Sequence, residues 1–137
     1  CALGISQISR LESIVKKRNK KFLIYKDLFK NLPVSLLDVP KNVKSSHHLA
    51  IMKLDNPNPT KHRKVFNFLR EKKIGVQLHY FPVHLQPFYK SLGFKEGYLP
   101  ISERYSRSVM SIPLYPELKI YDQKRIVHQL TYILKKV

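Results

Sequence analysis

The sequence predicts an α/β domain of the α+β type, with a small mixed or antiparallel sheet that is covered by helices and preceded by one long helix. Two observations support this class. Helical periodicity dominates both ends of the chain, whereas the middle holds short apolar runs bounded by proline and glycine. The predicted order of helix, strand, helix and strand lets the helices cover the sheet, which buries the apolar faces of both.

The composition is that of one folded domain. The chain has 137 residues, of which 43% are hydrophobic, and 7 Phe and 8 Tyr supply large core side chains. No run of about 18 apolar residues is present, so we expect no membrane-spanning helix. Cys1 is the only cysteine, which excludes an intrachain disulfide and fits a reducing compartment such as the cytoplasm. Because the chain opens on Cys1 within a helical pattern, we expect it to be a piece of a longer protein.

The net charge of +17 allows two interpretations. The 26 Lys and Arg, against 9 Asp and Glu, could bind nucleic acid or an anionic membrane, since polyanions release counterions on basic surfaces. Alternatively, solvated lysines cover the helix faces and ends. The basic residues are spread along the chain and form no basic-aromatic nucleic-acid motif. This favours the second interpretation, with neither nucleic acid nor membrane as a partner.

Residues 5–32 are predicted to form one long helix. Apolar or ring side chains recur at intervals of three or four and form one stripe: Ile8, Leu11, Val15, Phe22, Tyr25, Phe29 and Leu32. Arg18 interrupts the stripe, and Pro33 ends the helix. At 1.5 Å per residue the helix is about 40 Å long, which suits an interdomain or dimer contact. We therefore assign residues 1–32 to this helix and residues 33–137 to a small domain.

The middle of the chain is predicted to alternate strand and helix. After an irregular connector over 33–46, residues 47–54 have the composition of a largely buried strand. The next helix, over 61–73, has Thr60 as its expected N-cap, and Gly75 can supply the positive φ that ends it.

Shorter elements are expected in the C-terminal part. A turn between Gly93 and Gly97 leads into a short helix over 100–108. Residues 109–113 form the next strand, and the last helix spans residues 121–136.

Residues 75–89 form the segment that is richest in rings and hydrogen-bonding side chains. Alternate side chains of a strand point to opposite faces, so a strand over 76–80 would divide them into two sets: Val76, Leu78 and Tyr80, and Gln77 and His79. Pro82 ends this strand because it has no N–H to donate, and Pro87 closes the loop that follows. We interpret the segment as one wall of a binding site.

No complete catalytic set accompanies this wall. The sequence has no CxxC or HExxH pattern, no Gly-x-Ser-x-Gly elbow and no glycine-rich phosphate loop. Two segments could bring four histidines together, but their spacing is not that of a zinc site and no metal is expected: His47, His48, His79 and His84. The 9 acidic residues are scattered, so no pair of carboxylates for general acid–base chemistry is indicated.

Stretches along nearly the whole chain resemble the C-terminal domain of the DegT-type nucleotide-sugar aminotransferases. Residues 2–8 look like the start of that family's long helix, and residues 47–49 look like one of its strands. Residues 75–87 resemble its substrate-side loop, and residues 111–116 its proline-rich ending. The loop version found here, His-Tyr-x-Pro-Val-His-Leu-Gln-Pro, is most similar to the branch that makes 4-amino-4,6-dideoxy sugars from UDP-linked 4-keto sugars, as in pseudaminic acid synthesis.

The resemblance implies a fold-type I enzyme that uses pyridoxal phosphate and works as a homodimer in the cytoplasm. Glutamate would donate the amino group to a nucleotide-linked 4-keto-6-deoxy sugar, for surface polysaccharide or flagellin glycan synthesis. In the family, the lysine that carries the cofactor lies in an N-terminal domain ahead of the residue that matches Cys1. This chain would therefore have no catalytic or cofactor-binding residue, bind no pyridoxal phosphate alone and be inactive alone.

Four residues match the family's loop on the substrate side of the cleft and are the candidate substrate-binding residues: His79, Tyr80, His84 and Gln86. Their side chains could hold sugar or diphosphate oxygens. For His79 a structural role is the alternative, in which the imidazole hydrogen-bonds a carbonyl oxygen and locks the corner at Pro82. For the whole chain the alternative is a basic module that binds nucleic acid or an anionic surface.

Overall fold

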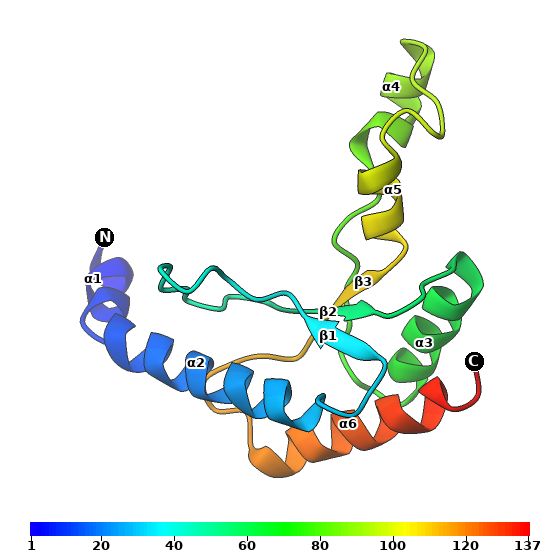
Figure 1. The fold of residues 1–137 in the computed structure, drawn as a ribbon. Coiled ribbons are helices and arrows are strands. Elements are labelled where there is room, and N and C mark those ends of the chain that lie inside the picture. The colour runs from blue at the N-terminus through cyan, green and yellow to red at the C-terminus, as the bar shows by residue number, and fades with distance from the viewer.

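The computed structural model describes all residues, 1–137, and shows a three-stranded antiparallel sheet with helices packed on one side (Figure 1). The strands are β1 (Val34–Leu36), β2 (Ala50–Leu54) and β3 (Val109–Ile112). The helices are α1 (Ala2–Ile8), α2 (Leu11–Leu28), α3 (Pro59–Glu71), α4 (Pro87–Ser91), α5 (Pro100–Ser106) and α6 (Ile120–Leu134), with a 3-10 turn, η1, over Val83–Leu85. The predicted fold class is confirmed.

The central strand of the sheet is β2, in the order β1-β2-β3. Alternate β2 residues, among them Met52 and Leu54, are buried in the core, because strand side chains alternate between faces. On the opposite face, Ile51 pairs with Ser111 of β3. We call this second face the helix-free face, because α2, α3 and α6 pack against the other one (Figure 1).

A cluster of 20 buried apolar side chains forms the core between the sheet and α2, α3 and α6. Phe22 and Tyr25 come from α2, Leu69 from α3 and Leu130 from α6, and each is almost fully buried. Burial of one such side chain contributes about 1.5–3 kcal/mol. The core therefore fixes the sheet, and with it the position of the helix-free face.

The single helix predicted over 5–32 is wrong, because it is two helices that break at Ser9 and Arg10. The Ser9 hydroxyl and the Arg10 Nε both donate to the carbonyl oxygen of Ser6, at 2.9 and 3.3 Å. Such local bonds compete with the helical ladder. Only the C-terminal half of the apolar stripe reaches the core, since Ile8 is 71% exposed and Leu11 is 53% exposed.

Arg18, the polar interruption of the stripe, ties three segments together. Its Nη1 donates to the carbonyl oxygens of His48 and Leu114, each at 3.0 Å, and of His47 at 3.4 Å. The guanidinium thus holds the segment before β2 and the chain after β3 against α2. Its position within an apolar stripe follows from this role.

Two predicted strands differ from the observed ones. The connector predicted over 33–46 contains β1, because Val34 is buried and pairs with Leu54. The strand predicted over 76–80 is reduced to one bridge, in which Gln77 and Ser111 exchange backbone hydrogen bonds of 3.3 and 2.8 Å.

The ends of α3 also differ from the predicted ones. Asn58 is the N-cap in place of Thr60, since its side chain accepts from the amide of Lys61 at 2.8 Å. After α3 it is Lys73, with φ +57°, that takes the left-handed conformation, and Gly75 does not. The predicted turn at Gly93 and Gly97 is confirmed, because both have positive φ.

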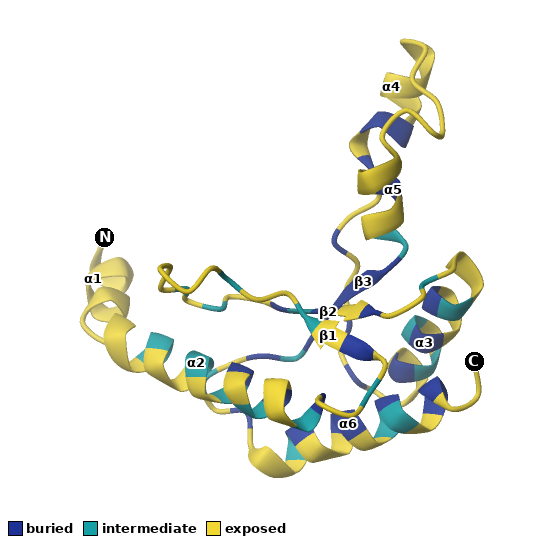
Figure 2. Ribbon diagram, viewed as in Figure 1, coloured by how far each residue is buried: buried dark blue, intermediate teal, exposed yellow.

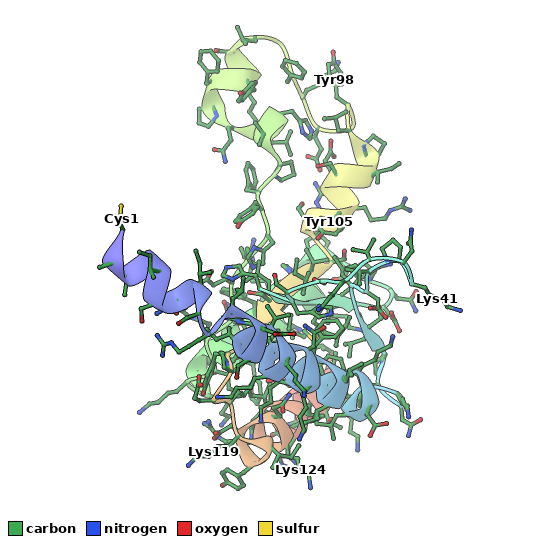
Figure 3. All side chains as sticks on the ribbon, turned by 90° about the vertical axis from the view of Figure 1, so that its left-hand side faces the viewer. Cys1, Lys41, Tyr98, Tyr105, Lys119 and Lys124 are labelled. Carbon is green, nitrogen blue, oxygen red and sulfur yellow. The ribbon has the colours of Figure 1, made fainter.

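Residues 80–106 form an arm that projects from the sheet, away from the helical layer (Figure 1). The arm carries η1, α4 and α5 and is exposed over most of its length (Figure 2). Tyr98 lies near the tip of the arm, and Tyr105 lies near its root, where the arm joins the sheet (Figure 3). No helix of the structure has the length and apolar character needed to cross a membrane.

Candidate functional site

The candidate site lies on the helix-free face of the sheet, where the arm begins. There His79 Nε2 lies 2.8 Å from the hydroxyl oxygen of Ser111 in β3. Only 6% of His79 is exposed, and this burial lowers the pKa of its imidazole. The Nδ1 atom of the same ring is buried and has no hydrogen-bond partner.

Glu103 of α5 fixes the second histidine of the segment. His84 Nε2 donates to Glu103 Oε1 at 2.9 Å, and both side chains are buried. The same carboxylate accepts from the amide of Gly97, at 2.9 Å for Oε1 and 3.1 Å for Oε2, and from the amide of Leu99 at 3.4 Å. The hydrogen bond from His84, followed by those from the two amides, lowers the pKa of Glu103. The ionised carboxylate thus joins η1, the Gly97 turn and α5.

The four candidate residues divide into two pairs. His79 and His84 are buried and each uses Nε2 for a contact within the chain. Tyr80 is 72% exposed, and Gln86 is exposed as well. The two histidines therefore hold the segment in place, while Tyr80 and Gln86 present polar groups to the surroundings. Contact of the four with a substrate stays a prediction.

The predicted faces of residues 76–80 are wrong. Val76 is buried but Leu78 and Tyr80 are exposed, whereas His79 of the other set is buried. The reason is that only Gln77 pairs with β3, so the chain leaves the strand conformation before Tyr80. The alternative structural role for His79 is realised with a different partner, the Ser111 hydroxyl.

Glu103 and Ser111 were not predicted as site residues. Glu103 is 19 residues from His84 in sequence, and no pattern links a helix carboxylate to a distant histidine. Ser111 did leave a signal, because it is the one polar residue in the strand sequence Val-Met-Ser-Ile. A hydroxyl in a buried strand needs a hydrogen-bond partner.

The four histidines do not form one cluster. His47 stacks on Phe22, with ring centroids 3.7 Å apart, whereas His79 contacts Ser111 and His84 contacts Glu103. Nowhere in the chain do three or more His, Cys, Asp or Glu side chains gather as metal ligands would. Every lysine is at least partly exposed, so the chain offers no enclosed amine that could carry pyridoxal phosphate. The residues of this chain alone therefore do not fit that cofactor.

The fold is that of the sugar aminotransferases. The structure of PseC from Helicobacter pylori, an aminotransferase involved in the biosynthesis of pseudoaminic acid, superimposes with a TM-score of 0.89 at 26% identity. The match covers 99% of this chain and 37% of PseC. The chain belongs to the DegT/DnrJ/EryC1/StrS aminotransferase family, whose model matches residues 1–131. This family uses pyridoxal phosphate.

Two relatives have informative names. The UDP-4-amino-4,6-dideoxy-N-acetyl-beta-L-altrosamine transaminase of Campylobacter jejuni is 33% identical over 138 residues, which cover 100% of this chain and 36% of that protein. The spore coat polysaccharide biosynthesis protein SpsC of Bacillus subtilis is 28% identical, over 98% of this chain and 36% of SpsC. The chain thus spans little more than a third of these relatives.

Proposed function

We propose that this chain forms the substrate-facing small domain of an aminotransferase that acts on a nucleotide-linked 4-keto-6-deoxy sugar, with glutamate as the amino donor. The observation that carries the proposal is the family match over residues 1–131. The Campylobacter transaminase and PseC support the substrate class, because both names refer to amino sugars or their biosynthesis. The product would serve surface polysaccharide or flagellin glycan synthesis.

In this proposal, the four candidate residues bind and orient the sugar. The Tyr80 hydroxyl and the Gln86 amide reach solvent and can donate to sugar or diphosphate oxygens. The Nδ1 atom of His79 supports a binding role, because a buried ring nitrogen without a partner calls for a ligand or a water. His84 would contribute from its anchored position beside Glu103.

Pyridoxal phosphate would supply the amino-group chemistry when bound, on a lysine outside these 137 residues. Alone, the chain would bind no cofactor and transfer no amino group. The exposed apolar side chains of α1 and the start of α2 would contact the cofactor-binding domain or the partner of a homodimer: Leu3, Ile8 and Leu11. We place this enzyme in the cytoplasm.

Two measurements test this proposal: the absorbance of bound cofactor and the KM of a Tyr80 variant. A protein that includes the upstream coding region should show the visible absorbance of bound pyridoxal phosphate, and the 137-residue chain should not. In the longer protein, Tyr80→Phe should raise KM for the keto sugar about tenfold with little change in kcat, since it removes a substrate hydrogen bond. Tyr98→Phe, which alters a similarly exposed arm hydroxyl, is the matched control. Equal KM values for both variants would remove Tyr80 from the site.

The basic composition keeps a nucleic-acid-binding module as a second candidate. Its signature is affinity that falls steeply with salt concentration. Titration of the chain with duplex DNA and with single-stranded RNA at several ionic strengths separates the two functions. Absent or millimolar binding at physiological salt would eliminate the second one.

A further inference from the structure

Two aromatic rings stack on the surface of the helical layer, where α3 packs along α6. The rings belong to Phe68 of α3 and Tyr132 of α6, with centroids 5.5 Å apart and planes at 24°. Arg125 of α6 donates to the carbonyl oxygen of Lys72 at 2.9 Å and fixes the end of α3 beside α6. The arm projects away from this layer (Figure 1), so the stacked pair is separate from the segment that carries the substrate-binding candidates.

Two ammonium groups surround this pair of rings. Lys136 Nζ donates to the hydroxyl oxygen of Tyr132 and lies 4.3 Å from the centroid of the same ring. Lys72 Nζ lies 5.3 Å from the centroid of the stacked Phe68 ring. The hydrogen bond from Lys136 is the largest of the effects that lower the pKa of Tyr132, and the charges of both lysines add to it, because a nearby cation favours the phenolate.

No other tyrosine of the chain combines these features. Tyr25 is buried, and its burial raises its pKa. Tyr98 has Lys95 Nζ 5.6 Å from its ring centroid but no cation at its hydroxyl. Tyr121, on the same helix as Tyr132, is 73% exposed and has neither contact. Tyr132 is 46% exposed, so its oxygen is both accessible and held beside a positive charge.

We propose that Tyr132 is a covalent modification site that takes an acyl group from an activated acyl donor. The hydroxyl oxygen attacks the carbonyl carbon of the donor and forms a C–O bond. The bond from that carbon to the leaving group breaks, and the phenolic proton departs with the leaving group. The ammonium groups of Lys136 and Lys72 would stabilise the negative charge that develops on the oxygen of the tetrahedral intermediate. This chemistry goes beyond amino transfer and needs no cofactor.

Acetylation of the 137-residue chain by N-acetylimidazole, with imidazole as the leaving group, tests the site. Hydroxylamine removes acetyl from tyrosine but not from lysine, so it identifies the ester. Trypsin releases Tyr132 on residues 126–135 and Tyr121 on residues 120–124, so mass spectrometry at low conversion measures both rates in one sample. Although Tyr121 is the more exposed, Tyr132 should react at least about threefold faster, since a larger phenolate fraction raises the rate.

Two lysine variants separate the hydrogen bond from the general positive charge. Lys136→Gln removes the cation at the Tyr132 hydroxyl and should bring its rate close to that of Tyr121. Lys135→Gln removes the same charge from the neighbouring position, which has no contact with the hydroxyl, and should change the rate less than about 1.5-fold. Tyr25 reports on folding in every variant, because its buried hydroxyl is acetylated only when the chain unfolds.

The proposal is overturned if Tyr132 reacts no faster than Tyr121, because exposure alone would then decide the rate. It is overturned equally if Lys136→Gln leaves the rate unchanged, or if Lys135→Gln lowers it as much as Lys136→Gln. The last result would mean that the net charge of +17 acts without a specific contact. Amino transfer by the longer protein would be unaffected by any of these outcomes, so the two proposals fail separately.

Discussion

Ser111 supports His79 by a single hydrogen bond on the helix-free face. Ser111→Ala would leave Nε2 as well as Nδ1 of a buried imidazole without a partner. We expect a loss of about 1–3 kcal/mol in the free energy of unfolding, because a buried polar group then lacks its hydrogen bond. Urea denaturation measures the loss, and Ser35→Ala, at an exposed position of β1, should cost less than about 0.5 kcal/mol. Equal effects would contradict the role of Ser111.

Glu103 gives the arm a defined pH dependence. Its pKa is held below the usual value by the hydrogen bond from His84 and by those from two amides. A glutamate of the unfolded chain titrates near pH 4.3, so between the two pKa values the unfolded chain binds more protons than the folded one. The contribution of Glu103 is therefore complete above the unfolded pKa and is lost as pH falls through the folded pKa.

Thermal unfolding between pH 7 and pH 2 detects this dependence. The unchanged chain should lose more stability below about pH 4.3 than Glu103→Gln, which cannot titrate. Glu117→Gln, which alters an exposed carboxylate, should follow the unchanged chain. Identical profiles for the Glu103 variant and the unchanged chain would show that the carboxylate does not hold the arm.

Helix α3 has Asn58 as its N-cap in place of the predicted Thr60. The Asn58 side chain accepts from the amide of Lys61, whereas Thr60 lies within the helix. Asn58→Ala should cost about 0.5–2 kcal/mol, and Thr60→Ala should be close to neutral, as measured by chemical denaturation. A larger loss for Thr60→Ala would restore the predicted boundary.

The longest predicted helix shows what periodicity leaves open. The stripe from Ile8 to Leu32 is apolar as predicted, but the helix breaks at Ser9 and Arg10, and only the second half of the stripe meets the core. An apolar stripe gives the spacing of side chains and not the identity of the surface that covers them. Arg18 could likewise not be interpreted, because its three carbonyl partners come from distant segments.

For the whole molecule, elements with strong local signals were predictable. The buried strand β2, helix α6 and the turn at Gly93 and Gly97 each lie within a few residues of the prediction. The candidate site was predictable only as a segment. Which of its side chains are buried depends on Gln77 pairing with β3 and on Glu103 reaching His84, and both are contacts between distant parts of the chain.

The arm has little hydrophobic core of its own. Outside its root it has almost no buried side chains, and its rings contact mainly one another, as in the pairs Phe88–Tyr89 and Phe94–Tyr98. Exposed apolar side chains that gather in this way are characteristic of a contact with another protein. This agrees with a chain that spans little more than a third of its relatives.

Transfer of labelled nitrogen tests the proposed amination of a keto sugar most directly. A protein that includes the upstream coding region is incubated with pyridoxal phosphate, amino-labelled 15N-glutamate and a UDP-linked 4-keto-6-deoxy sugar. We predict that 15N appears on the sugar of the nucleotide product, as seen by NMR. A keto sugar that stays unlabelled, with a folded and cofactor-loaded protein, would contradict the proposal.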